Sequence, residues 1–381
     1  MTDISFKLDP EIIIGMDTIN RAGPLCAARG GKAFILTEQV LYENKFIDRL
    51  LSILENANVE TLVFDDIPAQ ATAAVAETAA DLARGARCSI IVGFGGLKTQ
   101  ATARLCAMLA NSSAPVFELL DGKNPDESFL PYLAIPTTGR DPFLFSDSFI
   151  AVDHRDRSVK LIKTPRGICT ATIIDGGLSE SLSEKFASTT AFDGFCSCVE
   201  GYCSTRAHFL SDALFEHSMR LYASIMDSYM ENRVFDLVGG STNAGLLMAL
   251  GCATSAPGIG TALAYALNGR FPVAKSWCST AMLPYVLERM VTARPEKMAK
   301  VAGILGEPVE GAPVADAANM AVESIRRRMG LLKVPARLKE FDLSLDKLVT
   351  VAESARDLEF VSYSPKTISA EDAYDILKQA F

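Results

Sequence analysis

The sequence lacks the features that mark nucleic-acid-binding, membrane or secreted proteins. Its net charge is −9, from 37 basic and 46 acidic residues, and no run of Lys and Arg supplies the positive surface that nucleic acid needs. No apolar run approaches the ~20 residues that cross a bilayer. The N-terminal residues show no basic start followed by an apolar stretch. We therefore expect no nucleic-acid partner, no membrane partner and no secretory signal.

Paired cysteines are also missing, because none of the nine Cys belongs to a Cys-x-x-Cys motif. This usage is typical of reduced thiols and favours a cytoplasmic location. What the chain does have is apolar material, since hydrophobic residues make up 49% of it and charged residues 22%. Its 381 residues exceed the ~250–300 at which a single core stops growing. We therefore predict two folded domains.

The first half of the chain alternates short β-rich runs with helical patterns. The pattern predicts strands at 32–37, 60–65, 88–93 and 132–136, and helices at 46–54, 72–84 and 97–110. Such an alternation is typical of an α/β domain with a parallel sheet. Two further runs, 144–152 and 158–162, flank a polar turn and predict a hairpin.

The second half of the chain has a different pattern. From about residue 178, Gly and Pro become rarer and helical periodicity predicts helices at 184–203, 209–230, 239–254, 279–291, 314–330 and 369–380. We place the boundary at the glycine pair Gly176–Gly177, which ends a β-rich run. The prediction is an α/β domain over 1–176 and an all-helical domain over 177–381.

A glycine-rich turn, Gly93-Phe-Gly-Gly96, joins a predicted strand to a predicted helix. The N–H groups at a helix N-terminus favour an anion, and glycines let a ligand approach the backbone closely. Lys98 and Thr99 would add a positive charge and a hydroxyl donor. The turn predicts a phosphate site; a tight turn without a ligand is the alternative, and the turn alone does not decide between them.

An acidic residue, Glu38, follows the first predicted strand directly after Thr37. A carboxylate at this position of a doubly wound domain accepts hydrogen bonds from a ribose diol and repels a 2′-phosphate. We therefore expect NAD as the cofactor, with NADH preferred over NADPH. The alternative is that Thr37 or Glu38 caps the next helix.

Several blocks resemble, in order and spacing, those of the iron-containing (group III) alcohol dehydrogenases and their dehydroquinate synthase-like relatives. The block 93–104, with Gly95 and Gly96, resembles the pyrophosphate loop of that family, and 134–138, which ends in Thr137 and Thr138, resembles its adenine-side loop. The blocks 193–207 and 282–286 resemble its metal-ligand helix and a later motif.

This resemblance implies an N-terminal dinucleotide-binding domain, a helical C-terminal domain and a cleft between them that holds nicotinamide and substrate. It further implies a small-molecule substrate and a homo-oligomer such as a dimer. Lys160, in the predicted hairpin, lies near a lysine position of the family and is a weaker candidate for the cofactor side.

The chain departs from the family where the metal is bound. Members that use iron or zinc hold it with one Asp and three His. Asp193 matches the Asp, but Ser197, Thr261 and Lys275 stand at the three His positions. An ammonium has no lone pair and hydroxyls are weak ligands, so we expect no metal. Of the neighbouring residues, Cys196 and Cys198 leave open a rebuilt metal site.

The nucleotide side departs as well. Ala101 replaces the acidic residue that follows the glycine turn in the family, and Leu97 replaces its third glycine. A small Thr-Gly-Ser segment is rewritten as 139–143, which contains Arg140. Arg140 would neutralise a pyrophosphate or a substrate anion, or else simply pair with Asp141.

If the fold of the family is kept, Lys275 and Asp193 meet where the metal would be. The ammonium would stabilise a developing alkoxide while Asp193 keeps Lys275 ionised. Tyr265, one helical turn beyond Thr261, would lend a phenol proton, its pKa lowered by the ammonium. The alternative is a plain ion pair of Lys275 with Asp193 in an inactive pocket.

The function expected from these residues and from the resemblance is a metal-independent, NAD(H)-dependent oxidoreductase that acts on a small alcohol, aldehyde or ketone. Two alternatives stay open. One is an inactive nucleotide-binding or assembly homologue, and the other is non-redox chemistry in the same cleft, because a fold does not fix a function.

Overall fold

The computed structural model describes residues 6–68, 71–125, 128–181, 184–230 and 240–381. By their internal contacts, the residues form two compact units. The first comprises 1–138 and 143–181, and the second comprises 139–142 and 182–381. The segment 139–142 therefore belongs to the second unit, although it lies within the first predicted domain.

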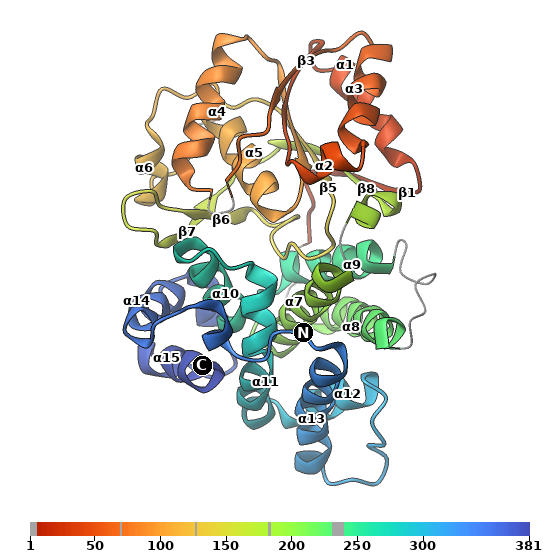
Figure 1. Ribbon diagram of the computed structural model, residues 1–381, viewed down its shortest axis with the longest axis vertical. Coiled ribbons are helices and arrows are strands. Elements are labelled where there is room, and N and C mark those ends of the chain that lie inside the picture. The colour runs from red at the N-terminus through yellow and green to blue at the C-terminus, as the bar shows by residue number, and fades with distance from the viewer. Residues whose placement is uncertain (1–5, 69–70, 126–127, 182–183, 231–239) are drawn as a thin grey trace. The chain divides into compact units, whose positions relative to one another are not determined.

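The first unit is built on a six-stranded sheet in the order β1-β8-β5-β4-β2-β3 (Figure 1), and all neighbouring strands are parallel. The strands are β1 (Glu11–Gly15), β2 (Lys32–Leu36), β3 (Glu60–Phe64), β4 (Ile90–Gly95), β5 (Tyr132–Pro136) and β8 (Cys169–Asp175). The predicted parallel sheet is confirmed. From β2 the chain passes to β3 on one side and then returns to β4 on the other, so the order of strands reverses between β2 and β4.

The helices and the hairpin of this unit connect the strands. The helices are α1 (Ala22–Ala27), α2 (Val40–Glu43), α3 (Phe46–Asn56), α4 (Ala73–Gly85), α5 (Leu97–Leu109) and α6 (Val116–Leu120), with short 3₁₀ turns at Thr18–Arg21 and Gly176–Ser181. The predicted hairpin is present as antiparallel β6 (Ser148–Val152) and β7 (Val159–Lys163).

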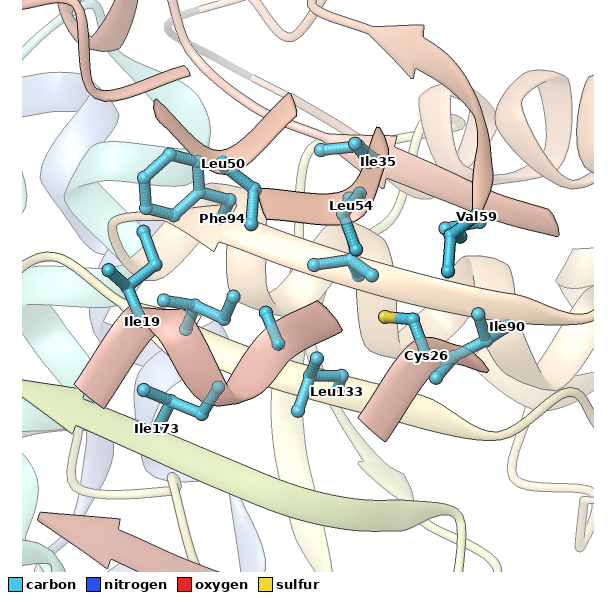
Figure 2. Packing of buried hydrophobic residues seen from close by; sticks show 14 of the residues in the cluster. Ile19, Cys26, Ile35, Leu50, Leu54, Val59, Ile90, Phe94, Leu133 and Ile173 are labelled. Carbon is cyan, nitrogen blue, oxygen red and sulfur yellow. The ribbon is translucent and has the colours of Figure 1, made fainter. Parts of the chain in front are cut away.

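An apolar core fills the space between one face of the sheet and the helices α1 and α3. Figure 2 shows Leu50 and Leu54 of α3 pointing toward Ile35 of β2 and Phe94 of β4. Every residue of β4 is buried, which is the pattern of a central strand covered on both faces. Because α5 packs directly on β4, the turn between them must be short and tight.

The described part of the second unit contains helices and no strand. The helices are α7 (Glu184–Cys203), α8 (Phe209–Met230), α9 (Gly240–Thr254), α10 (Ile259–Arg270), α11 (Lys275–Ala293), α12 (Pro295–Ile304), α13 (Val314–Leu332), α14 (Leu345–Arg356) and α15 (Ala370–Ala380), with 3₁₀ turns at Leu338–Phe341 and Glu359–Tyr363. The all-helical prediction is confirmed for these residues.

Three of these helices, α10, α12 and α14, were not predicted. Most residues of α10 are buried all round, so this helix has little of the amphipathic period on which such a prediction depends. The predicted helix at 279–291 begins earlier in the structure, and this makes Lys275 the first residue of α11.

Among the described residues, no single helix is both long and apolar enough to cross a membrane, although α9 and α10, bent by 108°, pass that test together by length and composition. All nine Cys are free thiols.

Candidate functional site

The glycine turn lies between β4 and α5, and its backbone is hydrogen-bonded to the carboxylate of Glu38. One oxygen of Glu38, Oε1, accepts a short hydrogen bond from the main-chain N–H of Gly96 and another from the hydroxyl of Thr99 at 3.0 Å. A Cβ atom on Gly95 would lie 2.6 Å from the same oxygen. Glycine at position 95 is therefore required for this close approach.

The strand order explains how Glu38 reaches the turn. Leu36 of β2 pairs with Gly93 of β4, so the carboxyl ends of these strands lie side by side where the strand order reverses. Ligands of doubly wound sheets bind at this reversal point. Glu38 satisfies the N-terminus of α5, whereas the alternative expectation was a cap on the next helix along the chain. Its predicted contact with a ribose stays a prediction.

Two further residues fix the turn, and sequence reasoning missed both. Gln100 Nε2 donates to the carbonyl oxygens of Gly93 at 2.9 Å and Gly95 at 3.0 Å. Tyr132 of β5 in turn donates its hydroxyl to Gln100 Oε1. Both side chains are buried, so these bonds hold the end of β4 in place. Nothing in the sequence marks Gln100 out, because its helix also carries Lys98, Thr99 and Arg104.

The adenine-side threonines lie next to the same turn. Thr137 N donates to Gly95 O at 3.1 Å, and a Cβ on Gly96 would lie 3.8 Å from Thr138. Lys98 is the second residue of α5. The structure thus brings together the predicted cofactor residues Glu38, Gly95, Gly96, Lys98, Thr99, Thr137 and Thr138.

Lys160 has a different environment on β7. Hydrogen bonds from Arg155, with a smaller contribution from the charge of Lys160, lower the pKa of Asp121 and of Asp153. The charged neighbours that Lys160 has in the structure are thus carboxylates, and its role on the cofactor side stays a prediction.

In the second unit, Asp193 of α7 is fully buried and carries two cations. Lys275 Nζ lies 2.6 Å from Asp193 Oδ1, and Arg140 Nη1 lies 3.1 Å from Asp193 Oδ2. The exposed fraction is 3% for Lys275 and 8% for Arg140. A buried carboxylate needs such partners, because an uncompensated charge in a dry interior is costly.

The position of Arg140 follows from the packing of the residue before it. A Cβ on Gly139 would lie 2.0 Å from Ser241 O, and one on Gly245 would lie 2.4 Å from the Cα of Gly139. Tyr222 also donates its hydroxyl to Gly139 O at 2.6 Å. These contacts with α8 and α9 fix the segment that carries Arg140.

The structure shows Arg140 paired with Asp193, and its predicted contact with a ligand anion stays a prediction. The guanidinium lies over the ring of Phe186, 5.1 Å from its centroid. Arg140 Nε is buried and has no hydrogen-bond partner among the described residues.

The two hydroxyls at former ligand positions are bonded to each other and to a buried acid. Ser197 Oγ and Thr261 Oγ1 are 3.1 Å apart, and Thr261 donates to Glu200 Oε2 at 2.7 Å. Since the hydrogen of Thr261 points to Glu200, the Ser197 hydroxyl has two acceptors, Thr261 Oγ1 and, at 3.4 Å, Asp193 O. Sequence reasoning missed Glu200; the available signal was an acid one helical turn beyond Cys196, on the same helix as Asp193.

Glu200 is held by the N-terminus of α10. Its carboxylate accepts three main-chain N–H bonds, from Gly258 at 3.1 Å, Gly260 at 2.6 Å and Thr261 at 3.0 Å. Burial raises the pKa of Glu200, and these bonds partly oppose that shift.

These residues do not fit a divalent cation. The ammonium of Lys275 lies on the Asp193 carboxylate, and both hydroxyls are used in the chain to Glu200. Burial raises the pKa of the thiols of Cys196 and Cys198, which keeps them protonated and poor as ligands. Among the described residues, no three His, Cys, Asp or Glu are grouped as a metal would require.

Tyr265 and Lys275 meet through the face of the tyrosine ring. Lys275 Nζ lies 4.8 Å from the ring centroid, within the range of a cation–π contact. The structure therefore brings the three predicted catalytic residues, Asp193, Tyr265 and Lys275, into one cluster.

Two family models match most of the chain. The model described as iron-containing alcohol dehydrogenase matches residues 9–176, and the one described as Fe-containing alcohol dehydrogenase family, C-terminal, matches residues 187–381. Lactaldehyde reductase of Escherichia coli (strain K12) is 22% identical over 361 residues, which cover 92% of each chain. Choline dehydrogenase of Bacillus subtilis (strain 168) is 25% identical over 383 residues, which cover 99% of this chain and 95% of the relative.

Solved structures show the same fold over the whole chain. A crystal structure of 1,3-propanediol oxidoreductase matches with a TM-score of 0.91 at 22% identity, covering 100% of both chains. Sulfoacetaldehyde reductase from Bifidobacterium kashiwanohense, in complex with NAD+, matches with a TM-score of 0.83 at 16% identity, covering 100% of this chain and 99% of the other.

We predict that Asp193→Asn destabilises the second unit by about 3–5 kcal/mol, because it leaves Lys275 and Arg140 buried without a counter-charge. Urea unfolding followed by the fluorescence of Trp277 measures this, since Trp277 is the only Trp of the chain and lies on α11.

The matched control is Asp212→Asn. Asp212 pairs with Lys297 at 2.8 Å, but both side chains are about a quarter exposed, so the expected cost is about 1 kcal/mol or less. Equal costs for the two variants would contradict the burial argument.

Proposed function

Because the chain belongs to the iron-containing alcohol dehydrogenase family, we propose that it is an NAD(H)-dependent oxidoreductase that acts without a metal on a small alcohol, aldehyde or ketone. The family comprises alcohol and aldehyde oxidoreductases. The observation that carries the metal-free proposal is the contact of the Lys275 ammonium with Asp193 at 2.6 Å. A fixed positive charge thus lies at a position that the resemblance assigns to a metal ligand.

The glycine turn supports the dinucleotide part of the proposal. It lies at the reversal point of the sheet, where nucleotides bind in doubly wound folds. The residues that would hold NAD(H) are Glu38, Gly95, Gly96, Lys98, Thr99, Thr137 and Thr138, with Lys160 as a further candidate. Bound NAD(H) would donate or accept the hydride. The negative charge of Glu38 at the end of β2 favours NADH over NADPH, because it opposes a 2′-phosphate.

In this mechanism Lys275 stabilises the negative charge that forms on the substrate oxygen. The ammonium is almost completely buried, and water therefore screens its charge little. One oxygen of Asp193 pairs with Lys275, and Arg140 holds the second oxygen. Each side chain is thus fixed before the reaction begins.

Tyr265 is the proposed proton donor for carbonyl reduction. Its phenol proton would pass to the substrate oxygen, and the positive charge of Lys275, which lies over the tyrosine ring, would stabilise the phenolate left behind. In alcohol oxidation the same proton returns to Tyr265.

A catalytically inactive nucleotide-binding or assembly homologue is the second candidate. The observation that favours it is that both carboxylate oxygens of Asp193 are paired with cations of the protein itself, so the cluster needs no ligand to be stable. Non-redox chemistry at the same residues is a third reading. A cytoplasmic location, a small-molecule substrate and a homo-oligomeric state, such as a dimer, belong to the main proposal, and the free thiols support the location.

We predict that the purified protein holds no stoichiometric iron or zinc, because Ser197, Thr261 and Lys275 replace the histidine ligands. Elemental analysis tests this directly. The triple variant Ser197→His, Thr261→His and Lys275→His should gain metal if the positions have kept their geometry. Near-equimolar metal in the parent protein, lost in Asp193→Ala, would refute the metal-free proposal.

The cofactor part of the proposal is tested by titrating the protein with NADH and NADPH while nucleotide fluorescence is followed. NADH should bind at least about tenfold more tightly than NADPH, since Glu38 opposes an added phosphate. Replacement of Glu38 by Gly should narrow the difference. Equal affinities in the parent protein would show that Glu38 does not face the ribose, and no binding of either would remove the oxidoreductase proposal.

The role of Lys275 is tested by Lys275→Met. If the ammonium acts on the oxyanion as it forms, kcat and kcat/KM should fall together by about 100-fold with little change in NADH affinity. Steady-state assays over a panel of small alcohols, aldehydes and ketones measure this.

Lys297→Met is the matched control for that experiment. Lys297 also pairs with an aspartate, Asp212, and its Nζ lies 4.3 Å from the centroid of the Tyr202 ring, but it is not part of the Asp193 cluster. Turnover should survive this change. Intact turnover in Lys275→Met would show that Lys275 is structural.

A further inference from the structure

The glycine turn of the first unit already holds an anion that belongs to the protein. Glu38 Oε1 accepts the Gly96 N–H and the Thr99 hydroxyl together. The same oxygen lies 2.6 Å from a Cβ built on Gly95 and 3.2 Å from one built on Gly96. One carboxylate oxygen of Glu38 therefore lies in the space beside both glycines, and the side chain of Thr99 shares that space at Gly95.

This arrangement joins the two strands between which the sheet order reverses. Glu38 follows β2, and Gly96 follows β4 directly before α5. The side chain of Glu38 is half-buried, so solvent reaches it. In contrast, Glu200 has an equivalent place at the N-terminus of α10 but is buried. The contact of Glu38 can therefore open without unfolding the unit around it.

A phosphate at this turn needs the donors that Glu38 uses. One N–H group cannot give full hydrogen bonds to two anions, and two negative charges at this distance repel each other. A phosphate that takes the Gly96 N–H and the Thr99 hydroxyl must therefore displace Glu38 from them. A neutral ligand that does not reach the turn binds without displacing Glu38.

We propose that Glu38 is an internal competitor for the phosphate position of the glycine turn, and that it sets how strongly nucleoside diphosphates bind there. The inference rests on the proposed nucleotide function, because it assumes that a diphosphate binds at this turn. Glu38 thereby becomes a determinant of affinity and not only a partner of the ribose.

Calorimetric titration of the full chain with ADP and with adenosine tests the proposal, using the parent protein and Glu38→Gln. Glutamine keeps the size of the side chain and its acceptor oxygen but removes the charge, so the turn is preserved. ADP should bind at least about tenfold more tightly to Glu38→Gln than to the parent protein. The affinity for adenosine, which carries no phosphate, should not rise.

The matched control is Glu77→Gln in the same unit. Glu77 Oε1 accepts a hydrogen bond from Val116 N at 3.1 Å, at the start of α6, and so it is also a carboxylate on a helix N-terminus. It takes no part in the glycine turn. ADP affinity should be the same in Glu77→Gln as in the parent protein.

Other results separate this inference from the proposed function. If Glu38→Gln weakens ADP and adenosine alike, Glu38 holds the ribose and the competitor role is wrong. Unchanged ADP affinity in Glu38→Gln would show that the negative charge of Glu38 does not oppose ADP binding, and this result also refutes the competitor role. In both cases the nucleotide site stands. If neither protein binds ADP, the inference and the dinucleotide part of the proposed function fall together.

Discussion

The burial of the Asp193 carboxylate is the constraint on which the site in the second unit depends. A fully buried negative charge is tolerated only with cations in direct contact, and Lys275 and Arg140 provide them. Lys275 reaches Asp193 from the first residue of α11. Arg140 reaches it because Gly139 packs on α9 without side-chain atoms. The packing of α11 and of the segment that contains Gly139 thus places both cations against the Asp193 carboxylate.

Three carboxylates of this chain show three ways to hold a negative charge. Asp193 is neutralised by side-chain cations, and Glu200 is held by three main-chain N–H groups and a hydroxyl at the start of α10. Glu38 uses one main-chain N–H and one hydroxyl at the start of α5. Its two bonds come from uncharged donors and it is partly exposed, so it is the carboxylate of the three that a ligand would displace at least cost.

The sequence predicted the parallel sheet and the helical second half, because strand and helix periods are local properties of the chain. It also predicted the meeting of Lys275 with Asp193, although only through family resemblance. It did not predict that Arg140 joins them, since that contact depends on Gly139 and Gly245, which are far apart in the chain but touch in the fold. Gln100 and Glu200 were missed for a similar reason, because their partners are main-chain groups that no side-chain motif reveals.

The replacement of the three ligand histidines, together with Arg140, has one electrostatic result. A divalent cation with one Asp and three neutral His carries a net single positive charge. Lys275 and Arg140 with Asp193 carry the same net charge in a similarly dry place. If the proposed metal-free reaction holds, the exchange keeps the field that favours an oxyanion but loses the coordinate bond to the substrate oxygen. A reaction without this bond would depend more on a proton donor, and the proposed donor, Tyr265, has its ring in contact with the Lys275 ammonium.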